Sequence, residues 1–394
     1  MGVSNKIFMA SRSNIIYLIG NGFDLAHGLK TSYKDFFIYY IKSCLKICEK
    51  KYRYDDHCLS ITYDRSLLPN NDLLGYFENT LRINRMDLLL PIQKLIFVST
   101  RRERVKSQPL TITPKNDFIK ELLLDCLNND WAGIEDAIFR NVVSSHLNLT
   151  NEKDQIARHK NKSSKYQSEL DNIKSLNLSV NCLKEHLINY LKTQNSPKDL
   201  LDNYFSQKLL RNVPITKSEQ AYNVYSRNIL FLNFNYTTYY IDLIENLKNN
   251  SLDKWTNYDH INIHGSLDEK LDDIIFGIGD EQNEYYSEIE TFYDNEWLYC
   301  MKSFHYLRNQ NYQNLLSFLE AGPYEIYIYG HSCSITDRTL LNMIFENINC
   351  KSIDLFHYNG MDSYLKTSYN VARNFKDKVK LRKVLKPYDP RFKM

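Results

Sequence analysis

The stretch IIYLIGNGFDLAHG (residues 15–28) decides the fold class, because an apolar run, a glycine-rich turn and a helix start follow one another in it. Its first residues are β-branched or apolar without interruption, which is typical of a strand buried on both faces of a parallel sheet. Gly20 and Gly22 allow a sharp turn, and we expect a helix to begin near Phe23 or Asp24. Such a turn presents free N–H groups to a nucleotide-like ligand, unless Asp24 merely caps the helix.

Several later runs share this apolar texture and predict further buried strands. They are ILFLNF (229–234), INIHG (261–265), IIFGIG (274–279), EIYIYG (325–330) and SIDLFH (352–357). Helical periodicity fills the region from residue 35 to 225, which is too long for a loop. We predict an α/β fold, a Rossmann-like parallel sheet with flanking helices and a large inserted helical subdomain. Residues 1–40 would form the first strand and glycine loop, 41–225 the insertion, and 226–394 the remainder of the Rossmann-like domain.

The overall composition is that of an ordinary globular protein, with 43% hydrophobic and 25% charged residues. The net charge of +3 is too small to indicate nucleic acid by itself. No window approaches the roughly 18 apolar residues of a membrane helix, so no membrane association is expected. The short apolar start continues directly into the glycine turn, which favours a strand over a cleavable signal and predicts a cytoplasmic protein.

The eight cysteines are scattered, and none forms a Cys-x-x-Cys pair. No metal site is therefore predicted. Cys44 and Cys48 are four residues apart, which is the spacing of one helix face and favours packing. Free thiols in a reducing compartment fit this pattern best.

A second polar motif, LNFNYTT (232–238), directly follows a predicted strand. Ligands of open α/β sheets bind at the carboxyl ends of strands. An asparagine such as Asn235 can hold a carbonyl, a water or a sugar hydroxyl, because its amide both donates and accepts. The alternative is an asparagine that caps the following helix.

A third motif is IHGS (263–266), which places His264 at a strand end beside a glycine. A histidine there is suited to act as a general base, because its ordinary pKa lies near neutrality. The alternative is a structural histidine whose hydrogen bonds are satisfied in the core.

The fourth motif, YGHSCSITD (329–337), again has the pattern of strand, turn and helix. It superficially resembles a nucleophile elbow, but Ser334 replaces the second glycine. A hydrolase triad would combine Ser332 with Asp354 and His357, all crowded into the following strand. A second turn that lines the same crevice is the favoured interpretation.

Taken together, these segments resemble the AbiH family of bacterial abortive-infection proteins, which act in phage defence. The resemblance is carried by LIGNGFDLAHGLKTSYKDF (18–36), WAGIE (131–135), LNFNYTT (232–238), IHGS (263–266), IFGIGDE (275–281) and YGHSCSITD (329–337). It spans nearly the whole chain and implies a protein that arrests the infected cell.

The same residues are more distantly similar to sirtuin-type domains, which bind NAD on a Rossmann-like sheet. The similarity aligns Asn235 with the sirtuin catalytic asparagine and His264 with the histidine of a histidine–glycine pair. Two departures put the cofactor in doubt, because Thr237 stands where sirtuins have an aspartate and Asp24 where they have a serine. The missing four-cysteine zinc module argues against protein deacylation, which leaves NAD-degrading domains as the nearer comparison.

This similarity implies an NAD glycohydrolase that hydrolyses NAD as its substrate. Asn235 and His264 would be catalytic, with Asn235 positioning water and ribose and His264 serving as base. Residues expected to contact NAD are Gly20, Asn21, Gly22, Phe23, Asp24, Gly28, Tyr236, Thr237, Gly265, Gly330, His331, Ser332 and Asp337. The helical block would sense an unknown phage trigger or mediate homo-oligomers.

Two other functions remain open. One is a nucleotide-regulated, RNA-acting toxin, which would use the basic C-terminal stretch KDKVKLRKVLKPYDPRFK (376–393) as its nucleic-acid surface; a second basic run is TRRERVK (100–106). These runs are more typical of solvated faces, so nucleic acid is the less favoured partner. The other is a non-catalytic, nucleotide-binding interaction protein.

Overall fold

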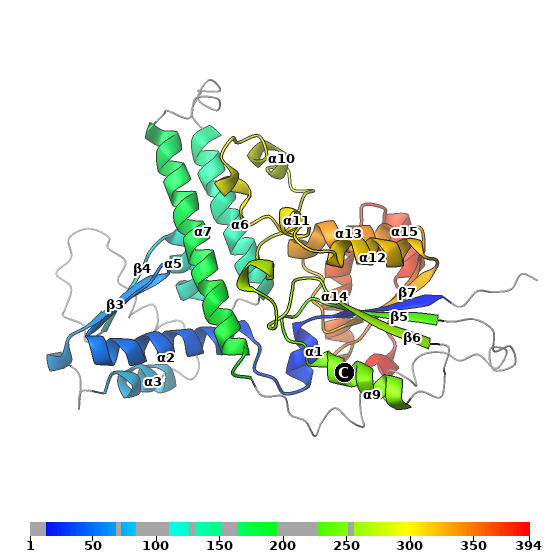
Figure 1. Cartoon of the computed structure of the whole chain (residues 1–394), viewed down its shortest axis with the longest axis horizontal. Coiled ribbons are helices and arrows are strands. Elements are labelled where there is room, and N and C mark those ends of the chain that lie inside the picture. The colour runs from blue at the N-terminus through cyan, green and yellow to red at the C-terminus, as the bar shows by residue number, and fades with distance from the viewer. Residues whose placement is uncertain are drawn as a thin grey trace, which may run out of the picture.

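The computed structural model describes residues 13–67, 72–83, 110–125, 131–150, 164–194, 227–250 and 256–394. Its centre is a five-stranded sheet with the order β6-β5-β1-β7-β8, in which every neighbouring pair is parallel (Figure 1). The strands are β1 (Asn14–Ile19), β5 (Arg227–Asn233), β6 (Thr256–Asn262), β7 (Tyr324–Tyr329) and β8 (Cys350–Leu355). The prediction of an α/β fold with a Rossmann-like parallel sheet is confirmed.

Strand β1 lies in the middle of this sheet and is buried along its whole length. Ile16 pairs with Leu230 on one side and with Ile326 on the other. The chain builds outward from β1 through β5 and β6, then crosses back to add β7 and β8 on the opposite side. The order therefore reverses between β1 and β7, which is the place where open α/β sheets bind their ligands.

Alternate residues of β1 enter two different cores, as the twofold periodicity of a strand requires. Ile16 and Leu18 pack with the helices α12 (Asn311–Glu320), α13 (Arg338–Glu346), α14 (Gly360–Arg373) and α15 (Lys378–Val384). Ile15, Tyr17 and Ile19 pack with α1 (Asn21–Ala26), α9 (Tyr240–Asn250) and η8 (Pro390–Phe392). Helices thus cover both faces of the sheet.

The described residues between α1 and β5 form further helices and a small antiparallel sheet, drawn to the left of the parallel sheet in Figure 1. The helices are α2 (Tyr33–Lys51), α3 (Leu73–Ile83), α5 (Asp117–Asp125), α6 (Trp131–Thr150) and α7 (Ser164–Leu191). The small sheet has the order β2-β3-β4 and consists of β2 (Arg53–Asp55), β3 (Leu59–Tyr63) and β4 (Leu110–Pro114). The core of this part also includes Phe276, Ile278 and Trp297, which come from the segment after β6.

The helical periodicity of residues 41–225 predicts a mainly helical subdomain and does not indicate the three strands of the small sheet. In LSITY and LTITP the buried residues alternate with less buried ones, as expected for strands with one face on a core. Runs of five residues are easily overlooked beside long helical periodicities. The basic run TRRERVK (100–106) lies outside the described residues.

The segment 274–279, expected to be a strand, does not join the sheet. It follows the short turn η5 (Leu271–Asp273), and Ile278 forms only an isolated bridge with Met301. A Cβ atom on Gly277 would lie 2.0 Å from the Cys300 carbonyl oxygen. The segment packs closely against residues 300–302: the Ile278 N–H donates to the Cys300 carbonyl, and the Ile278 carbonyl accepts from the Lys302 N–H. The prediction of a sheet strand at 274–279 is therefore wrong.

Short helical turns complete the described structure. They are η1 (Arg65–Leu67), α10 (Tyr286–Ile289), η6 (Asn295–Leu298), α11 (Lys302–His305) and η7 (Ile335–Asp337). None of the helices in the described ranges is both long and apolar enough to cross a membrane.

Candidate functional site

A cleft of about 360 Å³ opens at the carboxyl edge of the sheet, where the strand order reverses. Its volume is in the range of small-molecule sites. Twelve of the fifteen predicted site residues line it: Gly20, Asn21, Gly22, Asp24, Asn235, Tyr236, Thr237, His264, Gly330, His331, Ser332 and Asp337. The turns after β1, β5, β6 and β7 therefore converge on one site.

The other three predicted residues have structural environments and do not line the cleft. Phe23 is fully buried in the core beneath β1 and β7. Gly28 and Gly265 have φ angles of +82° and +83°, a backbone conformation that glycine adopts without strain. Gly28 directly follows α1, and Gly265 ends the turn after β6, so both positions are explained by local geometry.

The glycine turn after β1 packs directly against the turn after β7. A Cβ atom on Gly20 would lie 2.5 Å from the His331 Cα, and one on Gly22 would lie 2.8 Å from the Gly330 Cα. The Gly22 N–H donates to the Gly330 carbonyl, and the Phe23 N–H donates to the Gly20 carbonyl. The expectation that these two amides are free for a ligand is therefore wrong; the glycines are needed because two backbone turns meet.

Asp24, in the turn after β1, is 2% exposed, which is rare for a carboxyl group. Burial raises its pKa to about 7, although the nearby Thr237 hydroxyl and Asn235 amide favour the charged form. The Thr237 hydroxyl donates to Asp24 Oδ2 at 2.6 Å. The N-cap residue of α1 is Gly20, so Asp24 lies inside the helix and does not cap it.

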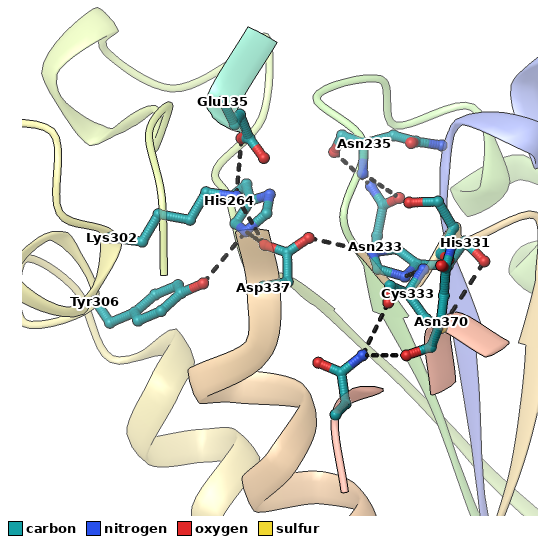
Figure 2. A network of polar contacts seen from close by, with 12 residues as sticks. Glu135, Asn233, Asn235, His264, Lys302, Tyr306, His331, Cys333, Asp337 and Asn370 are labelled. Atoms are coloured by element: carbon teal, nitrogen blue, oxygen red, sulfur yellow. Dashed lines mark hydrogen bonds and ion pairs between the residues drawn. The ribbon is translucent and has the colours of Figure 1, made fainter. Parts of the chain in front are cut away.

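The turn that carries Asn235 is organised by Asn233 (Figure 2). The Asn233 side-chain amide donates to the carbonyls of Asn235 and Thr237, and its oxygen accepts from the Asn235 N–H. Helix α9 begins only at Tyr240, so Asn235 does not cap it. The Asn235 Nδ2 is buried and makes no hydrogen bond of regular geometry with the described residues. Asn235 lines the cleft, and its amide is close enough to the Asp24 carboxyl to lower the pKa of that group.

A buried ion network lies at the side of the cleft (Figure 2). Lys302 is 0% exposed, and its Nζ lies 2.8 Å from Glu135 Oε1 and 2.7 Å from Asp337 Oδ1. Burial would raise the pKa of Asp337, but the Lys302 charge holds it well below its ordinary value. Burial raises the pKa of Glu135 to about 7, in spite of Lys302. Lys302 itself stays charged, because the two carboxyl groups raise its pKa against the effect of burial.

Two histidines also contact the Asp337 carboxyl, His264 at the oxygen that Lys302 binds and His331 at the other one. His264 Nε2 lies 3.4 Å from Asp337 Oδ1 and 3.3 Å from the Tyr306 hydroxyl. His331 Nδ1 accepts a hydrogen bond from the Cys333 N–H, which leaves the proton of the neutral ring on Nε2. That nitrogen lies 3.6 Å from Asp337 Oδ2, so the Asp337 carboxyl contacts both imidazoles as well as the buried lysine.

His264 is a weaker base than its position suggests. Burial lowers its pKa, the Lys302 charge lowers it further, and the Asp337 carboxylate only partly compensates. The imidazole is therefore neutral at neutral pH and has less tendency to take up a proton than an exposed histidine.

Three members of this network, Glu135, Lys302 and Tyr306, were not among the residues predicted for the site. Glu135 belongs to the WAGIE segment, which was noted only as part of the family resemblance. Nothing in the sequence marks Lys302, since a lysine is ordinarily exposed and its neighbours carry no motif. Only its complete burial shows its importance.

Helix α14 closes the cleft from the C-terminal side. Ser363, Lys366 and Thr367 line it, and Lys366 is an exposed cation with no ion pair to the described residues. The Asn370 amide donates to the Ser332 carbonyl. This bond supports the turn in which Cys333 adopts a φ of +53°.

The hydrolase triad considered above is not assembled. His357 Nε2 contacts the Asp389 carbonyl at 3.0 Å, and no hydrogen bond within the described residues joins it to Ser332. Asp354 does not line the cleft. The interpretation of this segment as a second ligand-binding turn agrees with the position of Ser332 at the cleft.

The strand order defines an α/β protein with a Rossmann-like parallel sheet, and the cleft lies at the carboxyl edge of that sheet. The chain belongs to the AbiH family: the family model described as "Bacteriophage abortive infection AbiH" matches residues 16–358. That span contains the turns after β1, β5, β6 and β7 that line the cleft, and it associates the chain with abortive infection by bacteriophage. No curated protein and no solved structure matches the chain.

Proposed function

We propose that the cleft binds a nucleotide of the NAD type and hydrolyses its N-glycosidic bond, and that this activity arrests the phage-infected cell. The observation that carries the proposal is the pairing of Asp24, with a pKa of about 7, with the buried Asn235 amide at the point where the strand order reverses. The similarity to sirtuin-type domains seen in the sequence supports the same choice of ligand.

The chemistry needs groups of this kind. Cleavage between nicotinamide and ribose develops positive charge on the sugar, as in other glycosyl transfers. A carboxyl group that titrates near neutral pH is partly charged there. As a carboxylate it stabilises the positive sugar, and it becomes neutral when it takes the proton that the attacking water gives up. We assign that role to Asp24, while Asn235 orients the water and the ribose.

His264 takes a different part from the one expected from the sequence. Because its pKa is lowered, it is less suited than Asp24 to accept a proton. As a neutral imidazole beside Asp337, it is placed to hydrogen-bond a ribose hydroxyl. The phosphates would lie toward Lys366, since the amides of Gly22 and Phe23 already have partners.

The test is incubation of the purified protein with NAD, with and without a candidate phage trigger, while free nicotinamide is measured by chromatography. We expect Asp24→Asn and Asn235→Ala to slow nicotinamide release, the former about 100-fold or more. Asp354→Asn is the matched control, because burial raises the pKa of Asp354 to about 6 although it lies outside the cleft. The proposal fails if NAD persists wherever the protein blocks phage, or if Asp24→Asn keeps full activity.

The RNA-acting alternative has less support from the C-terminal basic stretch. Lys378 donates to the carbonyls of Ala372 and Phe375, and Lys380 donates to the carbonyls of Glu346 and Asn347. Both lysines therefore have structural partners. RNA binding that weakens steeply with salt and is lost on neutralising Arg382 and Lys383 would favour this alternative over NAD hydrolysis.

A further inference from the structure

A second group of polar side chains lies apart from the cleft, between the small antiparallel sheet and helix α7. Its members are Asp56, Cys58, Cys182 and His186, and we call it the Asp-Cys-Cys-His cluster. Asp56 and Cys58 belong to the turn between β2 and β3, while Cys182 and His186 are four residues apart on α7. None of the four lines the cleft.

The geometry is that of ligands around one ion. One oxygen of Asp56 and the sulfurs of Cys58 and Cys182 lie within 4.8 Å of one another. His186 Nε2 lies 3.5 Å from Asp56 Oδ2, which is long for a charge-assisted hydrogen bond. Two ligand atoms about 2.1 Å from a shared zinc ion in tetrahedral geometry would be about 3.4 Å apart. The spacing therefore fits a shared ion better than a direct bond.

The surroundings hold these side chains in place. The hydroxyls of Tyr40 and Tyr54 donate to Asp56 Oδ2, and two backbone N–H groups of the turn donate to Asp56 Oδ1. Hydrogen bonds of this kind orient a ligating carboxylate in metal sites.

We propose that the Asp-Cys-Cys-His cluster binds one Zn²⁺ ion in tetrahedral geometry. Two sulfur ligands, one imidazole and one carboxylate suit zinc in hardness and in number, and four protein ligands define a closed, structural site. Binding requires the Cys58 thiol to lose its proton to solvent, so each bound ion releases at least one proton. The ion ties the turn between β2 and β3 to α7.

The lack of a Cys-x-x-Cys pair led to the prediction of no metal site. A Cys-x-x-Cys pattern reveals only ligands that are close together in sequence, whereas Cys58 and Cys182 come together only when α7 packs across the small sheet. The two residues on α7 could have been noticed, because a four-residue spacing places both on one helix face.

The test is the metal content of the full chain, purified under reducing conditions without chelator and measured by inductively coupled plasma mass spectrometry. We expect about one zinc ion per chain in the wild type and in the control Cys350→Ala, whose buried cysteine lies on β8. In Cys58→Ser and Cys182→Ser we expect less than about a tenth of that content. His186 is 30% exposed and should be replaceable without unfolding, so His186→Ala should fold and bind zinc at least about tenfold more weakly.

A second measurement separates loss of the ion from loss of the fold. A chelator should lower the melting temperature of the wild type and of Cys350→Ala, and leave that of His186→Ala nearly unchanged. Absence of zinc in the wild type, together with no uptake at micromolar zinc, would overturn the proposal. So would a Cys58–Cys182 disulfide found by mass spectrometry in the native protein, or wild-type zinc affinity in His186→Ala.

Discussion

Replacing Lys302 by methionine tests whether the buried network beside the cleft depends on its one cation. The Nζ of Lys302 contacts Glu135 and Asp337 at 2.8 and 2.7 Å, and the side chain is 0% exposed. Methionine preserves most of the volume but leaves two carboxyl groups without their positive partner. Removing one member of a buried ion pair costs about 3–5 kcal/mol of unfolding free energy, because the remaining charge cannot be hydrated.

The assay is urea unfolding of wild type and variant, followed by fluorescence at pH 8 and pH 5. The loss should be smaller at pH 5, because Glu135 is protonated below its pKa of about 7 and no longer needs a cation. The control is Lys42→Met. Lys42 pairs with Glu78 at 2.7 Å but is 35% exposed, so its loss should cost less than about 1 kcal/mol.

Two results would refute this reasoning. If Lys302→Met costs no more than Lys42→Met, the carboxyl groups do not depend on the buried cation. If the triple variant Glu135→Gln, Lys302→Met, Asp337→Asn is not more stable than Lys302→Met at pH 8, the loss does not arise from unpaired charge.

Three further predictions concern the turns after β1, β5 and β7. The pKa of Asp24 is about 7 in the folded protein against an ordinary value of 3.8, so between pH 4 and 7 the folded state binds more protons than the unfolded state. As the pH rises from 4 to 7, the unfolding free energy of the wild type relative to Asp24→Asn should therefore fall by at most about 1.4 kcal/mol per pH unit. A difference that does not change with pH would contradict the raised pKa. Thr237→Val removes a donor to the charged carboxylate, so it should move the upper end of that window to higher pH, as infrared or NMR titration of the carboxyl would show. Gly330→Ala should destabilise the fold by about 2 kcal/mol or more in thermal unfolding, because the added Cβ would lie 2.2 Å from the Phe23 backbone nitrogen. The control is Gly28→Ala, which has a φ of +82° but open space around it and should cost only about 1 kcal/mol. Equal losses would mean that the close contact is not the cause.

The parts of the fold that sequence predicted well are those with continuous, strongly apolar patterns. Strands β1, β5, β7 and β8 correspond to such runs, and the turns that follow three of them carry the residues of the cleft. The apolar run at 274–279 has the same texture, yet its backbone passes under residues 300–302 instead of joining a strand. Periodicity reports burial, and burial alone does not specify a partner.

The site was predicted where turns carry glycine or asparagine and missed where it depends on long-range packing. Asp24, Asn235 and His264 follow strands whose ends necessarily meet at one edge of the sheet. Glu135 lines the cleft from α6, and Lys302 binds it from α11; the positions of both helices follow from tertiary packing. Their charges pair only in the folded chain, so no local pattern distinguishes them from surface residues.

The central position of β1 has a consequence for synthesis of the protein. Its hydrogen-bonding neighbours begin at residues 227 and 324, so the strand emerges from the ribosome long before either neighbour exists. At roughly 5–20 residues per second, it waits some tens of seconds without a partner. A chain that stops early has the glycine turn but lacks the turn after β7 that packs against it. The cleft therefore cannot be completed before the turn after β7 has been translated, so shorter chains lack an assembled cleft.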